Sequence, residues 1–382
     1  MRFHFSDEQE MLRRTARTFA ERELPPRYLR ELDASGRAPH WELLPKMAAL
    51  GFTALPVPVE YGGLAGGVVD VTVLLEELGR TSVSVASMLN FAIGFGCETV
   101  KRFGSDAQKN DLLPKLVRGE MCFAFSLTEP DAGSDAAAIR TKAVAEGDGY
   151  VIDGTKIFTT GAAESRCLVV ATRTDSTVPK HRGISLFLVD PRTPGITFRK
   201  IEKLGMRGAG GLYEVHYENV RVPRTALLGP LNGGWEAVKA TLERVRLSQA
   251  AYCIGCAQKV VEDAVKYANE RQQFGQPIGK FQAIAHLLVD LQVQVDAARW
   301  LLYRAAWLVD RGVRCVKEAS MANLACTEAM LKVTSEAMRV YGGYGLTMEF
   351  DIQRHFRDAR LFVIGDGSSQ IQRNLIARMM GL

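Results

Sequence analysis

The sequence predicts an α+β protein of three parts: an N-terminal helical domain over residues 1–120, a middle antiparallel β barrel or sandwich over 121–230, and a C-terminal four-helix bundle over 231–382. Apolar residues recur at helical spacing in the first and last parts, whereas the middle part consists of short β-branched and aromatic runs. No proline follows Pro277, which leaves the last part free to form long helices. With 382 residues, 47% of them hydrophobic, the chain can build more than one core.

The first part begins with a helix-start signal. Ser6 and Gln9 have the spacing of a capping box, and apolar residues follow at helical intervals until Pro25 and Pro26 end the pattern. Gly51 marks the end of the second helix. The further helices are predicted over residues 41–50, 69–78, 86–103 and 107–117.

The middle part reads as strands separated by turn residues. Gly and Asp interrupt the pattern at 147–149 and 153–154, and Pro-Gly does so at 194–195. The predicted strands cover residues 150–152, 156–158, 167–172, 184–189, 196–200 and 213–222. The third part reads as helices over residues 235–271, 281–311 and 316–341, with a last helix after Gly367.

Composition excludes several classes of function. The net charge of +5 is modest and the charges are interspersed, so we expect no nucleic-acid partner. No apolar run is expected to approach the roughly 20 residues of a membrane span, so we expect no membrane insertion. Seven unpatterned cysteines and an N-terminus without a signal-peptide pattern indicate a reducing, cytoplasmic location. The six histidines lie far apart in sequence, so no metal site is predicted.

Asp366 stands between Gly365 and Gly367, just before the last predicted helix. Gly-Asp-Gly is ordinary turn chemistry, and it is also a way to hold a carboxylate out into a cavity. A second informative stretch, CFAFSLTEPDAGSDAAAIR at 122–140, is dense in hydroxyls and small residues that let backbone N–H groups approach a ligand.

Three more stretches complete a recognisable set: KIFTTGAAESRCLVVATR (156–173), ERQQFGQPIGKFQAI (270–284) and VYGGYGLTMEFDIQRHFRDARLFVIGDGSSQIQR (340–373). Together with the α–β–α order, they resemble the acyl-CoA dehydrogenase family of flavoproteins over essentially the whole chain. The resemblance implies FAD in a cleft between the β domain and the bundle. It also implies a homotetramer in which a neighbouring subunit completes the FAD site.

The resemblance carries particular cofactor contacts over to this chain. The loop from Phe125 to Ser134 would cradle the flavin, Phe158 would pack on the ring and Arg271 would reach a pyrophosphate across a subunit interface. Without the family, Phe158 reads as a strand core residue. Arg339 stands where the family usually has Gln. The implied FAD contacts are Phe125, Leu127, Thr128, Gly133, Ser134, Phe158, Thr159, Thr160, Arg271, Phe274, Arg339, Gly342, Gly343, Ser368 and Gln370.

The resemblance also implies the catalytic base. Most family members carry Glu at the place of Asp366, and a branched-chain subgroup carries its Glu at the place of Val245, so Asp366 is the one carboxylate at a known base position. Asp is one methylene shorter than Glu, and members acting on cyclohexanecarboxyl-CoA are similar in using Asp here. The implied substrate contacts are Ser134, Glu243, Arg246, Asn90, Phe91 and Gly367, the aromatic among them favouring a short or compact acyl group.

Three alternatives stay open at this point. Nitroalkane oxidases of the same superfamily also use an Asp base and pass electrons to oxygen. The thioester could belong to an acyl carrier protein instead of CoA. A flavin-free scaffold is the third alternative, against which the intact motifs speak. For the lead interpretation, the electron acceptor is an electron-transfer flavoprotein or a similar protein.

Overall fold

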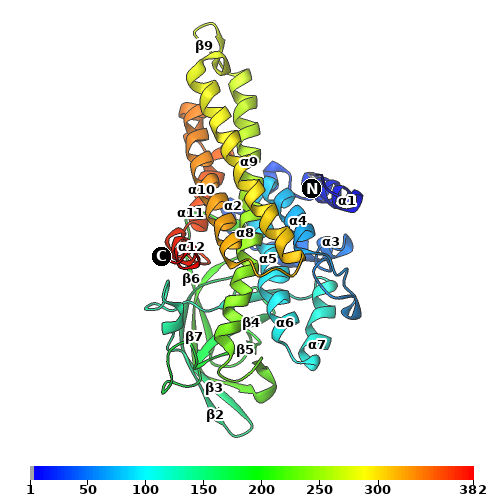
Figure 1. Cartoon of the computed structure of the whole chain (residues 1–382), viewed down its shortest axis with the longest axis vertical. Coiled ribbons are helices and arrows are strands. Elements are labelled where there is room, and N and C mark those ends of the chain that lie inside the picture. The colour runs from blue at the N-terminus through cyan, green and yellow to red at the C-terminus, as the bar shows by residue number, and fades with distance from the viewer. Residues whose placement is uncertain (1–3) are drawn as a thin grey trace.

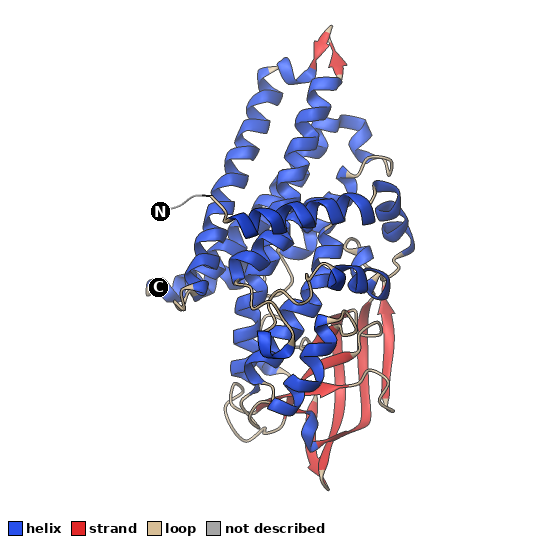
Figure 2. Ribbon diagram, turned by 90° about the vertical axis from the view of Figure 1, so that its right-hand side faces the viewer, coloured by secondary structure: helices blue, strands red, loops and turns tan. Residues whose placement is uncertain are grey.

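The computed structural model describes residues 4–382 and consists of a helical N-terminal part, a β domain and a long helical bundle (Figure 1). The bundle extends away from the β domain. The N-terminal helices pack beside the junction of the two, and the strands form a sheet beside the lower helices (Figure 2). The tip of the bundle carries a small hairpin of β9 (Gln272–Gln273) and β10 (Gln276–Pro277).

The N-terminal part is helical as predicted, and the Ser6–Gln9 capping box is present. The predicted single helix over 86–103 is interrupted, because the π-helix Phe91–Gly96 separates two α-helices. The α-helices of this part are α1 (Asp7–Glu23), α2 (Pro26–Ser35), α3 (His40–Ala49), α4 (Val68–Thr81), α5 (Val83–Asn90), α6 (Cys97–Phe103) and α7 (Asp106–Val117).

The expectation about apolar runs needs a correction in this same region. Among residues 4–382, one helical stretch, Val83–Phe103, is long and apolar enough by composition to cross a membrane, with a mean hydropathy of 1.4. In the structure 89% of that stretch is buried. Its side chains belong to the core that the N-terminal helices share with α8 (Gly234–Glu270).

The β domain is one sheet in the order β6-β7-β3-β2-β4-β5-β8, with β1 paired to β4. Most neighbouring strands are antiparallel, as predicted, but β4 pairs in parallel with both β1 and β2. The strands are β1 (Phe123–Ser126), β2 (Lys142–Glu146), β3 (Gly149–Thr160), β4 (Cys167–Arg173), β5 (Ile184–Val189), β6 (Ile196–Ile201), β7 (Leu212–Pro223) and β8 (Leu227–Leu228).

Two strand expectations are wrong in detail. The runs 150–152 and 156–158 belong to one long strand, β3, and the Asp153-Gly154 pair between them is a register shift against β7 and not a turn. Strands β1 and β2 are not among the predicted strands, and the sequence interpretation places the residues of β1 in a ligand-binding loop. As a result of this strand arrangement, the end of β3 and the segment after β1 lie side by side.

The bundle contains three long helices whose bounds lie within one or two residues of the prediction, and α11, which the sequence interpretation does not predict. Helix α8 packs against α4, α9 and α10, so it joins the N-terminal part to the bundle. Two shorter helices follow α10 and lie across its lower end (Figure 1). The helices are α8, α9 (Gln282–Asp310), α10 (Val316–Tyr341), α11 (Ile352–Phe362) and α12 (Ser369–Met380).

Candidate active site

Asp366 lies in the tight turn between α11 and α12. The sequence interpretation assigns the backbone freedom to both flanking glycines, but the structure gives it to Asp366 itself, with φ of 53°, and to Gly367, with φ of 94°. Gly365 has no positive φ. Asp is among the few non-glycine residues that adopt the left-handed region readily. The turn therefore fits Asp at this position on backbone geometry alone.

The carboxyl of Asp366 has a shifted protonation equilibrium. Part of the side chain is exposed, yet desolvation by the surrounding protein raises its pKa to about 6, while the positive charge of Arg246 acts to lower it. The guanidinium of Arg246 is buried, and a Cβ added at Gly367 would lie 3.8 Å from its Nη2 atom. Asp366 and Arg246 are thus brought together from distant parts of the sequence.

The other carboxylate considered on this stretch of α8 is Glu243. It is half-buried, and its negative charge favours the charged form of Arg246. Val245 is fully buried and apolar, so the position used by the branched-chain subgroup offers no base here. Of these positions, the Asp366 turn presents the carboxylate whose pKa burial raises.

The loop predicted to cradle the flavin is fixed by a residue that sequence reasoning does not single out. Lys156 of β3 is fully buried, and its Nζ donates to the backbone oxygen of Leu127 at 2.9 Å and to Oε1 of Glu129 at 2.8 Å. Burial lowers the pKa of Lys156 to about 8. The N–H of Ile157 donates to the carbonyl of Thr128 at 2.9 Å. The two segments with implied flavin contacts therefore form one rigid unit.

Glu129 completes this unit from the other side. Its carboxylate accepts hydrogen bonds from the backbone N–H groups of Arg140 at 2.6 Å and Thr141 at 2.9 Å. The sequence predicts a ligand-binding loop at the Thr-Glu-Pro motif but no role for its Glu. A lysine at an inward position of a strand, with a glutamate in a neighbouring motif, is the signal that could have identified the pair.

Phe158 is exposed in the single chain, which contradicts its interpretation as a strand core residue. Its φ is 60°, and its side chain is 58% exposed. Such a φ is rare for a bulky side chain. The register shift between Lys156 and Thr159 turns the ring outward.

The neighbouring threonines differ in direction. The hydroxyl of Thr159 points into the β-domain interior, 3.2 Å from the hydroxyl of Ser126, so a cofactor contact from Thr159 would come from its backbone. Thr160 is partly exposed.

The remaining implied residues near the cleft are accessible to different degrees. Gly133 and Ser134 are exposed in the loop after β1. Ser368 caps α12 by accepting from the N–H of Ile371, and Gln370 is exposed in the first turn of that helix. Asn90 and Phe91 lie at the start of the π-helix and are described below.

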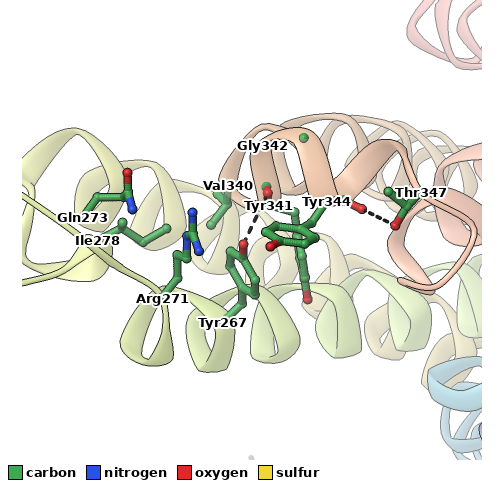
Figure 3. A pocket seen from close by; sticks show the side chains of 10 residues that line it. Tyr267, Arg271, Gln273, Ile278, Val340, Tyr341, Gly342, Tyr344 and Thr347 are labelled. Atoms are coloured by element: carbon green, nitrogen blue, oxygen red, sulfur yellow. Dashed lines mark hydrogen bonds between the residues drawn. The ribbon is translucent and has the colours of Figure 1, made fainter.

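A second group of implied residues gathers at the tip of the bundle. Arg271, Gly342 and Gly343 line a surface pocket of about 540 Å³, in which Arg271 lies over the ring of Tyr344 at 5.6 Å (Figure 3). Phe274, in the hairpin, is 94% exposed. Arg339 is not in this group, because it points to solvent and pairs with Glu336 at 2.7 Å.

The tip group and the Asp366 group are far apart within one chain (Figure 1). Arg246 lies within α8 and Arg271 at its C-cap. A helix rises about 1.5 Å per residue, so their backbones lie roughly 37 Å apart along the axis. One flavin cofactor bound at the cleft does not reach the tip of the same chain. Within residues 4–382, no group of three or more His, Cys, Asp or Glu side chains is arranged to hold a metal ion.

Comparison with known proteins identifies the family. Three family models match: the acyl-CoA dehydrogenase N-terminal domain over residues 6–120, the middle domain over 124–220 and the C-terminal domain over 232–381. The chain belongs to the acyl-CoA dehydrogenase family. Its members are FAD flavoproteins, so the chain is an FAD-dependent oxidoreductase, and the flavin-free alternative is set aside.

Individual relatives match over their full length. The chain is 37% identical to the caffeyl-CoA reductase–Etf complex subunit CarC of Acetobacterium woodii, covering 99% of both chains. Among solved structures it is similar to butyryl-CoA dehydrogenase from Megasphaera elsdenii, with a TM-score of 0.96, 32% identity and all of both chains covered. It is also similar to the prolyl acyl carrier protein oxidase AnaB, with a TM-score of 0.95, 30% identity and 99% and 100% coverage.

The residues present fit an FAD cofactor. The exposed Phe158 ring offers an apolar surface next to the clamped Leu127–Thr128 loop, where an isoalloxazine ring would be held. The pocket at the tip combines the Arg271 guanidinium with Gly342 and Gly343, which suits a pyrophosphate. The two groups of residues that fit parts of FAD lie at separate places on the chain.

Proposed function

We propose that this enzyme removes two hydrogens from the Cα–Cβ bond of an acyl thioester, with Asp366 as the base that takes the α-proton. The observation that carries the proposal is the left-handed turn that holds Asp366 beside Arg246. A raised pKa of about 6 keeps the carboxylate mostly ionised at neutral pH and basic enough to accept a proton. Bound FAD would accept the hydride from Cβ.

The other residues position the reacting groups. An α-proton next to a thioester is a weak acid, so the carbonyl oxygen has to be hydrogen-bonded, and the backbone N–H of the turn at Gly367 is suited to this. Lys156 and Glu129 fix the loop that would support the flavin. The positive charge of Arg246 lies beside the base and favours its ionised form. Asp366 reaches about 1.5 Å less far than Glu would, so either the turn lies closer to the substrate or the substrate binds differently.

We further propose that the enzyme is a homotetramer and that the tip of one chain completes the FAD site of another. The support is the separation of the two implied groups and the apolar exposure around the tip: Phe274 is 94% exposed and Leu346 78%. The outer side of α9 also carries exposed Val289, Val293 and Trp307, a further surface suited to contact between copies. Dissociation should release FAD, which size exclusion with absorbance at the flavin wavelength measures.

The electron acceptor that we propose is an electron-transfer flavoprotein, in the cytoplasm. The support is the similarity to a relative that is named as a subunit of a complex with such a flavoprotein. Reduction of the acceptor, compared with consumption of oxygen, tests this and separates a dehydrogenase from the nitroalkane-oxidase alternative. Rapid oxygen consumption with a nitroalkane would overturn the dehydrogenase proposal.

The acyl group that we propose is short, branched or alicyclic, such as cyclohexanecarboxyl-CoA. An acyl carrier protein thioester is the second candidate, favoured by the similarity to the prolyl acyl carrier protein oxidase. Anaerobic addition of a panel of thioesters, with bleaching of the flavin as the signal, decides between them. Bleaching only by the carrier-protein thioester would overturn free acyl-CoA as the substrate.

A further inference from the structure

A buried amide lies where α5 passes into the π-helix. Asn90 is 1% exposed, and within the described part of the chain its Oδ1 atom has no hydrogen-bond partner. The amide occupies the space left by Gly94, since a Cβ there would lie 2.1 Å from Oδ1. A buried acceptor without a partner is unfavourable, and such groups mark places where a ligand supplies the missing donor. π-Helical turns are frequent at functional sites.

Aromatic contacts join the segment next to this amide to the implied flavin loop, and a further contact lies close to the base. On one side, Phe91 stacks on Phe95 at 5.2 Å, and Phe95 contacts Phe125 of β1 at 5.5 Å. On the other side, Tyr252 of α8 contacts Phe362 at 5.3 Å. Phe362 ends α11, shortly before the Asp366 turn.

Tyr252 connects the amide to the base. Its ring is buried, and that burial raises its pKa; the negative charge of Asp366 adds to this, while hydrogen bonding from Ser87 and Asn90 acts to lower it. Asn90 and Asp366 therefore flank the same phenol. Tyr252 and Phe362 are bulky and buried, so they fill the interior beside the Asp366 turn.

We propose that Oδ1 of Asn90 accepts a hydrogen bond from a hydroxyl or N–H group of the substrate's acyl group, so that the enzyme selects short polar acyl thioesters over plain hydrocarbon ones. The inference rests on the proposed function, because it takes Asp366 as the site of the α-proton, and it narrows the proposed short acyl group to one that carries a polar group, in place of a plain hydrocarbon such as cyclohexanecarboxyl. A polar acyl group satisfies the amide on binding. A hydrocarbon of the same size leaves it unpaired, which is the strongest form of discrimination a binding pocket has.

The test compares two thioesters of equal size. In 4-hydroxybutyryl-CoA a hydroxyl replaces the terminal methyl group of pentanoyl-CoA. Titration calorimetry with the FAD-loaded enzyme, without an electron acceptor, should give at least about 10-fold tighter binding of the hydroxylated thioester. In Asn90→Leu, which keeps the size and removes the acceptor, the ratio should fall to one or below.

Thr99→Val is the matched control. Its hydroxyl is buried one turn of helix beyond the π-helix but already has a partner, Thr241 at 2.8 Å, so its removal should leave the ratio at the wild-type value. Equal affinity of the wild-type enzyme for the two thioesters overturns the proposal, as does an unchanged ratio in Asn90→Leu.

Flavin bleaching in the same titration separates this proposal from the function on which it rests. Bleaching by both thioesters without a difference in affinity supports the dehydrogenase and overturns the role of Asn90. A difference in affinity without bleaching by any thioester supports the Asn90 contact and overturns the dehydrogenase.

Discussion

The region around Asp366 and the tip around Arg271 both contain residues with implied FAD contacts, but the first is rigid and largely buried and the second is exposed. In the cleft, the loop after β1 is held by a buried lysine, a buried glutamate and backbone hydrogen bonds. At the tip, Arg271 is partly exposed and rests on one ring, and the neighbouring Phe274 is almost entirely exposed. The loop beside Asp366 is fixed by contacts within its own chain, whereas the groups at the tip are largely exposed.

The difference shows where preorganisation is needed. A base and a hydride acceptor have to be aligned within fractions of an ångström, so the segments that support them are rigid before any ligand binds. A pyrophosphate contact contributes affinity and tolerates more freedom. We therefore expect changes in the cleft to affect turnover and folding, and changes at the tip to affect cofactor retention and assembly.

The largest expected effect comes from Asp366→Asn. The substitution keeps the size and the left-handed turn, which Asn also tolerates, and removes the base. Anaerobic flavin reduction by a competent thioester should slow by about 10²–10⁴-fold, while the FAD absorbance spectrum stays. Asp358→Asn is the control, since Asp358 also has a pKa raised to about 6 by burial but bonds the backbone of Met206. Equal loss in both variants would mean that Asp366 acts on folding and not on chemistry.

Lys156→Met should have the next largest effect, this time on stability and flavin binding together. It leaves the Glu129 carboxylate buried without its cation, which costs about 3–5 kcal/mol of unfolding free energy. Denaturant unfolding measures this, and the released Leu127–Thr128 loop should weaken FAD binding. Lys142→Met, at an exposed position of β2, is the control and should change neither. If Lys156→Met binds FAD normally, the clamp is not what positions the loop.

These two residues also show what sequence reasoning can and cannot find. The helices of the bundle can be predicted closely, because long amphipathic patterns without proline have few alternatives. The family motifs identify Asp366 and Arg271. The role of Lys156 cannot be predicted from the sequence pattern, because it depends on a register shift in β3 and on a partner 27 residues away. Asp366 is found, but the positive φ belongs to the aspartate itself, where the sequence interpretation assigns it to the glycine neighbours.

The sequence also does not predict which side chains near the site are exposed. Phe158 and Thr159 are adjacent in one strand, and only the bulge determines that the ring turns outward while the hydroxyl turns in. Arg339, next to the end of α10, has helical geometry that directs it to solvent. Patterns predict which residues are near a site in sequence, and the side chain's direction comes from packing.

We expect the pH dependence of turnover to come from Asp366. Burial raises the pKa of Asp366 to about 6, so the carboxylate that accepts the proton is lost as the pH falls through this value. The kcat/KM for the thioester should therefore drop about 10-fold per pH unit below the pKa and level off above it. FAD retention should not follow this profile, which absorbance after gel filtration at each pH measures. A parallel loss of FAD would show that acid acts on the fold.

Arg271→Lys tests the expectation that changes at the tip affect cofactor retention more than folding. Lysine keeps the charge but cannot form two parallel hydrogen bonds to a pyrophosphate, so FAD affinity should fall by about 10-fold. Unfolding free energy should change by less than about 0.5 kcal/mol, since surface substitutions rarely do more. Titration of apoenzyme with FAD gives the affinity. A large loss of stability would mean that Arg271 is part of the fold of its own chain.

The smallest expected effect comes from Phe274→Ser in the hairpin. The side chain is 94% exposed. Its removal therefore costs the single chain almost no buried apolar surface, and the unfolding midpoint at low protein concentration should stay within a degree or two. If another copy covers the ring, the same change removes buried area between chains, and the oligomer should dissociate at a higher protein concentration. Analytical ultracentrifugation over a dilution series reads this directly, and unchanged association would leave the exposed tip with a role other than contact between copies.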